Sequence, residues 1–145
     1  ELQVRSSVRV LSAHRTPDET VLTIKNAEKE GIRVVIAFAG MSAALAGVSA
    51  AHTLLPVIGV PCANGPLSGF DAALSTMQMP PGIPVATVAV NGGRNAALLA
   101  ARILALTDRE LRERLERRGV DDRARYAPEA VEVELAKRRA ARKRK

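Results

Sequence analysis

The sequence predicts an α/β domain built on a parallel β-sheet, followed by a charged helix and a basic tail. Three observations lead to this fold class. Apolar, β-branched stretches alternate with longer stretches of helical pattern, and strands joined by connections of that length pair in parallel. The stretch "IRVVIAF" has almost no polar interruption, as expected for a strand that helices cover on both faces. A length of 145 residues is enough for one domain with a substantial core.

The first two expected elements flank the stretch "SAHR". Residues 8–11 ("VRVL") predict a short strand, and residues 17–30 predict a helix. Thr16 can cap this helix, Pro17 fits its first position, and Glu19 completes a capping box with Thr16. The residues between the two elements should therefore lie at the carboxyl end of a strand, where ligands bind in α/β folds.

Three further strands and three further helices are expected in alternation. The strands are predicted at 32–38, 56–61 and 84–90, and the helices at about 43–52, between residue 69 and about 79, and at about 95–106. Thr107 and Glu110 form a second capping box, which opens a highly charged helix. We expect the α/β domain to cover residues 1–119 and a charged C-terminal extension to cover 120–145.

The formal net charge of +7 is concentrated at the C-terminal end of the chain. Residues 137–145 hold seven lysines and arginines and no acidic residue, which leaves the remainder of the chain neutral. We expect a solvated tail, with a weak contact to RNA or another polyanion as the alternative. The basic charge therefore says little about the folded body.

The composition excludes several classes of protein. The chain has one tyrosine, two phenylalanines and no tryptophan, which argues against modules that stack nucleic-acid bases on aromatic side chains. No apolar run is long enough to cross a bilayer, and the first ten residues do not resemble a signal peptide. Cys62 is the single cysteine, so an intramolecular disulfide and a cysteine-cluster zinc site are excluded. We expect a cytoplasmic protein.

Four loops of similar composition should form the functional site. They are the segments "SAHR" at 12–15, "AGMS" at 39–42, "CANGPLSG" at 62–69 and "NGGRN" at 91–95. Parallel strands end at the same edge of a sheet, so these loops should gather at one rim. Their small residues allow backbone amides to approach an anion, and His14 and Arg15 add polar side chains. The prediction is a site for an anionic small molecule; the alternative is that His14 and Arg15 belong to a surface turn.

Four segments resemble the 5-(carboxyamino)imidazole ribonucleotide mutases of purine biosynthesis, the PurE family. They are "SAHRTPDE", "PVIGVP", "GPLSGFDAALSTMQMPPGIPVATVAV" and "NAALLAARIL", and the resemblance extends over about residues 8–106. It implies a flavodoxin-like domain of three α/β/α layers that assembles into a homo-octamer. It also implies a reaction without metal or organic cofactor, in which a carboxyl group moves from the exocyclic amine of a ribonucleotide to an imidazole ring carbon. The alanine-rich helices expected at 43–52 and 95–106 should then pack between subunits.

The resemblance also assigns roles to residues of the predicted rim. His14 would be the catalytic proton shuttle, since a neutral imidazole can give and take a proton near pH 7. Arg15 would bind the substrate phosphate, because its planar group of donors matches the phosphate oxygens. The other substrate-binding positions would be Ser12, Ala13, Gly40, Ser42, Ala43 and Ser68, of which the last belongs to a loop that closes on the substrate.

One loop departs from the mutase pattern and leaves other activities open. The mutases have a segment similar to "GGAAHLPG", whereas this chain has "GMSAALAG", with Ala44 at the position of the histidine. The class that carboxylates aminoimidazole ribonucleotide directly with carbon dioxide has a loop resembling "GRSNALSG", so this reaction is the first alternative. A non-catalytic nucleotide-binding or scaffold relative, whose basic tail recruits a partner, is the second.

The start of the sequence also differs from the family pattern. Family members begin with a strand and a loop resembling "GSxSD", which binds the phosphate and ribose of the nucleotide. The present sequence begins at a point that corresponds to the end of the first helix. We therefore expect these residues to lack a strand from the middle of the sheet and to show little activity by themselves.

Overall fold

The computed structural model describes residues 2–142, without the side chains of residues 138–140 and 142. The chain divides into two compact units. The α/β unit is Val4–Leu104, and the helical unit combines Glu1–Gln3 with Ala105–Lys145.

A parallel sheet forms the centre of the α/β unit, as the sequence predicted. Strands β1 (Val35–Gly40), β2 (Val57–Cys62) and β3 (Ala86–Thr87) lie side by side in the order β1-β2-β3. Both pairs are parallel, with Val35 opposite Val57 and Ile58 opposite Ala86. Strand β3 is shorter than the predicted 84–90. Backbone hydrogen bonds nevertheless continue along β2 beyond it, since the N–H of Val88 donates to the Gly59 carbonyl at 3.1 Å.

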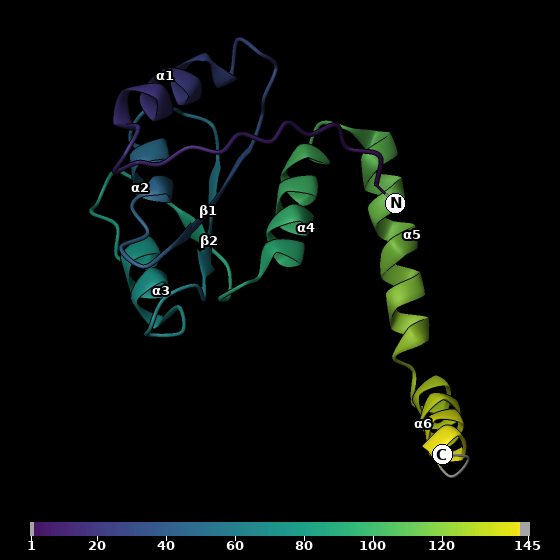
Figure 1. Ribbon diagram of the computed structural model, residues 1–145. Helices are drawn as coiled ribbons and strands as arrows, with labels where there is room; N and C mark the ends of the chain where they lie inside the picture. The colour runs from purple at the N-terminus through teal and green to yellow at the C-terminus, as the bar shows by residue number, and fades with distance from the viewer. Residues whose placement is uncertain (1, 143–145) are drawn as a thin grey trace. The chain divides into compact units, whose positions relative to one another are not determined.

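Helices cover both faces of this sheet, as Figure 1 shows. Helices α2 (Leu45–Ala50) and α3 (Phe70–Met77) pack on one face, and α4 (Gly93–Leu104) packs on the other. Helix α1 (Pro17–Ala27) packs against α2. The arrangement is the predicted three-layer α/β/α architecture.

The side chains of β2 alternate between two hydrophobic clusters. Ile58 and Val60 face α4, where they contact Ala96 and Ala100. Val57, on the opposite face, packs in a cluster with residues of β1 and α2. Both faces of the strand are buried, and this explains the uninterrupted apolar runs of the sequence. The small alanine side chains of α4 allow its backbone to lie close to the sheet.

Gly59 is required by the close approach of α3 to the sheet. A Cβ at this position would collide with the methyl group of Thr76 and would lie 3.3 Å from the Cβ of Ala46. Thr76 itself is 2% exposed, and its hydroxyl donates to the Ala72 carbonyl at 2.7 Å. A side chain at Gly59 would therefore have no flexible neighbour to displace.

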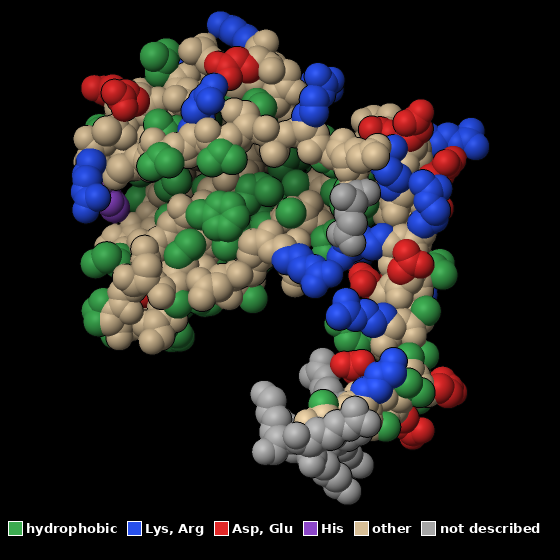
Figure 2. Space-filling view, turned by 45° about the vertical axis from the view of Figure 1, so that its right-hand side comes forward, with side chains coloured by type: hydrophobic (Ala, Val, Ile, Leu, Met, Phe, Trp, Pro, Cys, Tyr) green, Lys and Arg blue, Asp and Glu red, His purple; other side chains and the backbone are tan. Residues whose placement is uncertain are grey.

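The predicted strand at 8–11 is not formed. Residues 4–11 have no regular secondary structure, and the side chains of Val8 and Val10 are 83% and 98% exposed. A strand requires a neighbour to pair with, and this segment pairs with no strand of the described chain. The edge of β1 that faces away from β2 pairs with no other strand in the described part of the chain. Phe38 on β1 is 54% exposed. Figure 2 shows a group of hydrophobic side chains on the surface of this unit.

Helix α1 begins where expected, but the predicted capping box is wrong. Thr16 occupies the N-cap position and Pro17 the first turn, yet no side chain caps the helix. The Thr16 hydroxyl instead interacts with the backbone of Ser12, four residues earlier. The local turn thus competes successfully with the cap for this hydroxyl group. After α1, Gly31 adopts a φ of +82°, which favours glycine where the chain turns toward β1.

The helical unit contains α5 (Arg109–Arg125) and α6 (Pro128–Arg142). The second predicted capping box is wrong, because Asp108 and not Thr107 is the N-cap. The Asp108 carboxylate accepts from Leu111 N at 2.9 Å, and a leucine at this position cannot complete a capping box. Helix α5 is continuous through Gly119. Ion pairs four residues apart line it, and these are Arg109–Glu113, Arg112–Glu116, Arg114–Glu110 and Arg118–Asp122. The first two are exposed, whereas the side chains of Arg114 and Arg118 are only 22% and 12% exposed. Exposed pairs such as the first two add little stability each.

Helix α6 includes the first part of the basic tail. Residues 137–142 belong to α6, and residues 143–145 lie outside the described chain. Within the described chain, no helix combines the length and apolar character that crossing a membrane would require.

Candidate functional site

Three of the four predicted loops meet at the carboxyl edge of the sheet. The loop after β1 contacts the loop after β2, since Asn64 packs directly on Gly40 and the Met41 side chain lies over Gly65. The loop after β2 also reaches the end of the last strand, where Gly69 lies against the Val90 side chain. Residues 39–42, 62–69 and 90–93 therefore form one continuous surface, as the parallel sheet predicts.

Asn91 joins the loop after β3 to the end of β2. Its side-chain oxygen accepts a hydrogen bond from Ala63 N at 3.0 Å, and its own N–H donates to the Pro61 carbonyl at 2.8 Å. The sequence separation across the first of these bonds is 28 residues. At the carboxyl end of the sheet, a side chain as well as the backbone therefore links these two segments.

Backbone strain is concentrated on the same loops. Met41, Ser68 and Asn91 have φ values of +55°, +51° and +58°, a region that L-amino acids rarely occupy. Gln3 is the only other non-glycine residue with positive φ in the described part of the chain. Strained residues of this kind persist where surrounding structure holds them, and they cluster at functional sites.

The fourth segment, Ser12–Thr16, forms a tight turn that exposes its central side chains. The hydroxyl of Ser12 accepts from Arg15 N at 3.2 Å, and its carbonyl accepts from Thr16 N at 2.9 Å. Ser12 N in turn donates to the Thr16 hydroxyl at 3.1 Å. His14 and Arg15 at the tip are exposed, and Ala13 is half-buried. Ser12 therefore builds the turn that presents the histidine and arginine.

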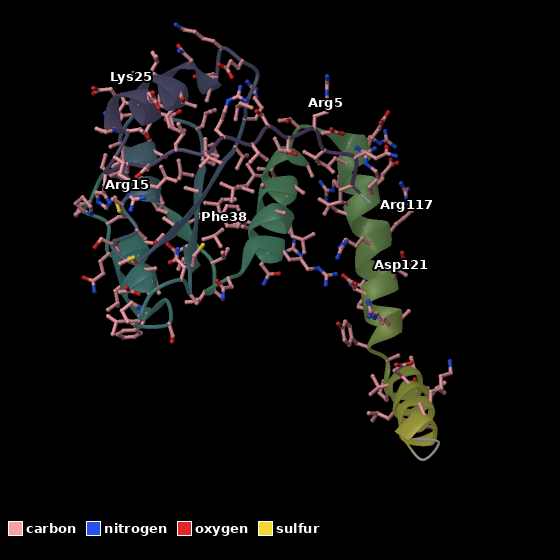
Figure 3. All side chains as sticks on the ribbon, in the orientation of Figure 1. Arg5, Arg15, Lys25, Phe38, Arg117 and Asp121 are labelled. Atoms are coloured by element: carbon pink, nitrogen blue, oxygen red, sulfur yellow. The ribbon has the colours of Figure 1, made fainter. Side chains whose placement is uncertain are left out.

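None of the hydrogen bonds and ion pairs of residues 2–142 connects Ser12–Thr16 with residues 39–42, 62–69 or 91–95. Arg15 lies near the start of α1, apart from Phe38 on β1 (Figure 3). The prediction that all four loops gather assumed that residues 8–11 form a strand of the sheet, and these residues form none. The place of His14 and Arg15 beside the other three loops stays a prediction.

The predicted substrate-binding residues of the rim differ in accessibility. Ser42 and Ser68 are exposed, and Gly40 is the last residue of β1. Ala43 is only 2% exposed, so it belongs to the packing beneath the loop more than to its surface. The exposed hydroxyl groups are therefore the accessible donors among these four positions.

Sequence reasoning missed Asn64 and Asn91 and left the role of Asp71 open. Both asparagines stand in loops rich in glycine, where asparagine often adopts left-handed conformations, and this composition was the available signal. Asp71 lies in the first turn of α3, and one of its carboxylate oxygens is buried without a hydrogen-bond partner. No group of three or more histidine, cysteine or acidic residues within the described ranges could hold a metal ion.

A family model described as AIR carboxylase matches residues 1–124 of this chain. An N5-carboxyaminoimidazole ribonucleotide mutase from Pyrococcus abyssi is 50% identical over 117 residues, which cover 81% of this chain and 67% of the relative. The mutase from Escherichia coli K12 is 53% identical over 116 residues, which cover 79% of this chain and 69% of the relative.

A solved structure gives the same result for the fold. The crystal structure of Treponema denticola PurE superposes with a TM-score of 0.75 at 31% sequence identity. The superposition covers 86% of this chain and 77% of the other. The similarity therefore extends over most of the chain.

Proposed function

Because this chain belongs to the AIR carboxylase family, we propose that it is an N5-carboxyaminoimidazole ribonucleotide mutase, an isomerase of purine biosynthesis. The observation that carries the proposal is its identity of 50% and 53% to mutases over 81% and 79% of the chain. The reaction transfers a carboxyl group from the exocyclic nitrogen of the nucleotide to a carbon of its imidazole ring.

We assign the rim of the α/β unit to the substrate. Gly40 and Ser42 form the wall after β1, with Ala43 packed beneath them, and Ser68 stands in the loop after β2. The exposed hydroxyls of Ser42 and Ser68 are suited to donate hydrogen bonds to the migrating carboxylate. The positive-φ residues Met41, Ser68 and Asn91 support this assignment, because strained backbone conformations cluster at functional sites.

In this proposal, His14 moves the proton and Arg15 binds the phosphate. When the carboxyl group leaves as carbon dioxide, His14 gives a proton to the exocyclic nitrogen. When the ring carbon attacks carbon dioxide, the carbon becomes tetrahedral, and His14 removes the ring proton to restore the aromatic imidazole. The two transfers cancel, as an isomerisation requires. Ser12 and Ala13 support the turn, which is fixed internally and accessible at its tip.

We also propose that the enzyme is a homo-oligomer, specifically an octamer. Phe70, Leu74 and Met77 share one face of α3 at helical spacing and are 67%, 37% and 54% exposed. Leu67, just before the helix, is 60% exposed. Such a stripe is larger than isolated exposed side chains and is typical of a protein–protein contact. The stripe lies on α3, whereas the sequence predicted subunit contacts through the alanine-rich helices at 43–52 and 95–106.

Two further expectations complete the proposal. We place the enzyme in the cytoplasm, where a soluble nucleotide substrate would be used. The basic residues from Lys137 onward make a weak, salt-sensitive contact with polyanions that is separate from catalysis.

The test supplies the purified chain with N5-carboxyaminoimidazole ribonucleotide, and in parallel with aminoimidazole ribonucleotide and carbon dioxide. We expect ring-carboxylated product from the first substrate at low bicarbonate, at the low rate expected of these residues by themselves. Product only from the second mixture would assign the direct carboxylase reaction instead. A folded chain that binds the nucleotide but forms no product from either mixture would identify a non-catalytic relative.

A further inference from the structure

We propose that Asn91 is a positioning residue that fixes the loop Cys62–Gly69, and with it Ser68, for substrate binding. The inference rests on the proposed function for its link to the substrate, but the contact itself is defined by the geometry of the loop. Nothing in the sequence pattern of the strands and helices requires a side chain to connect these segments.

The loop Cys62–Gly69 closes on itself at its base. A Cβ placed on Gly69 would lie 3.2 Å from Ala63 Cα and 3.3 Å from Ala63 N, so the two ends of the loop are in contact. The same Cβ would lie 2.7 Å from Val90 Cγ1. Both ends of the loop therefore rest on the segment Val90–Asn91, and Ser68 stands one residue from this base.

Asn91 is the residue that holds the base. Its N–H donates to the carbonyl of Pro61 in β2, and its side-chain oxygen accepts from Ala63 N, the first residue after the strand. The donor in the second bond is an N–H group, so the side-chain atom that faces it must be the carbonyl oxygen. The orientation of the amide is thereby determined, and the loop begins in one fixed direction from the end of the strand.

The backbone at Asn91 also explains why asparagine is suitable there. Its φ of +58° is left-handed, and asparagine and aspartate tolerate this region better than other residues with a Cβ. Glycine would accept the same φ but has no side-chain acceptor. Alanine would lose the acceptor and add backbone strain. Aspartate, glycine and alanine at position 91 therefore allow the hydrogen bond and the backbone conformation to be tested separately.

The experiment compares Asn91→Asp, Asn91→Gly and Asn91→Ala with the wild-type chain. It measures hydrogen exchange at the Ala63 amide, the thermal midpoint, and kcat and KM for N5-carboxyaminoimidazole ribonucleotide. We expect Asn91→Asp to retain wild-type values. In Asn91→Gly and Asn91→Ala, we expect Ala63 to exchange roughly five- to tenfold faster, as loss of one hydrogen bond allows. Their kcat/KM should fall by roughly tenfold or more, mainly through a higher KM.

The two weakened variants separate positioning from stability. Asn91→Ala should melt at a lower temperature than Asn91→Gly because of its strained φ, yet both should lose kcat/KM to a similar degree. A kcat/KM that follows the melting temperature, or that is unchanged in Asn91→Gly, would overturn the inference. If the wild-type chain shows no turnover, the proposed function fails instead. Hydrogen exchange at the Ala63 amide then decides the question alone. Faster exchange in Asn91→Gly, together with a wild-type exchange rate in Asn91→Asp, supports the positioning role. An unchanged exchange rate in Asn91→Gly refutes it.

Discussion

The Asn64 side chain lies directly against the Cα of Gly40, so that a methyl group at Gly40 would overlap the Asn64 amide. Gly40 ends β1 and Asn64 belongs to the loop after β2, so this contact connects two walls of the candidate site. Asn64 itself is exposed and can rotate away. The contact therefore determines the shape of the loop more than the stability of the fold.

Gly40→Ala should consequently reduce activity more than stability. We expect the free energy of unfolding to change by less than about 1 kcal/mol, because an exposed side chain can move aside. The KM for the nucleotide should rise, since the displaced Asn64 moves the loop that carries Ser68. Thermal unfolding and steady-state kinetics measure the two effects. Gly119→Ala is the matched control, because a Cβ there meets nothing within 4 Å and activity should not change.

Gly59→Ala should destabilise the α/β unit. The new methyl group would collide with Thr76 and lie 3.1 Å from the Val85 side chain in a buried region. Overpacking of this kind costs about 1–3 kcal/mol, which urea unfolding would detect. The double variant Gly59→Ala/Thr76→Ser removes the colliding methyl group and should recover part of the loss. An unchanged unfolding midpoint for Gly59→Ala would contradict the close packing of α3 on the sheet.

His14→Asn should preserve the fold and abolish turnover. The side chain is exposed at the tip of its turn, so its replacement should leave the melting temperature unchanged. An amide cannot exchange protons near neutral pH, and the variant should bind the nucleotide without converting it. Calorimetric binding and a product assay make the distinction. Near wild-type turnover would show that another group moves the proton.

Substitutions on the exposed stripe of α3 should break the assembly. Met77→Lys introduces a charge beside Phe70 and Leu74, and burial of an unpaired charge at a contact is costly. Light scattering should show a smaller particle for this variant than for the wild-type chain. Leu22→Lys is the control, because Leu22 is 62% exposed on α1 and lies outside the stripe. Wild-type chain that is monomeric from the outset would contradict the proposed octamer.

Asp108→Ala should weaken the start of α5. Asp108 is the N-cap and accepts from the backbone N–H of Leu111, and loss of such a cap costs about 0.5–2 kcal/mol. Asp108→Asn retains an oxygen acceptor and should behave like the wild-type chain. Circular dichroism during thermal unfolding would report the loss of helix. Equal effects of the two substitutions would indicate that the charge, and not the cap, is responsible.

The sequence by itself determined the layered α/β architecture. The apolar runs around Val35 and Val57 predicted buried parallel strands, because burial on both faces leaves no position for polar residues. The alanine-rich stretch that became α4 predicted a helix able to pack closely. The same patterns predicted four loops at one edge, because parallel strands all end at the same edge of a sheet. These properties depend on residues close together in the chain. Contacts join three of these loops, at 39–42, 62–69 and 90–93.

Only the tertiary structure decided which local patterns were realised and which distant residues meet. Residues 8–11 have the composition of a strand, yet pairing requires a neighbour that composition does not supply. Thr16 has the composition of a cap, but the Ser12 backbone engages its hydroxyl. The contact of Ala63 with Asn91 spans 28 residues, and it forms because β2 and the end of β3 are neighbours in the sheet. Local preference sets what each segment can do, and the partners available in space select among those possibilities.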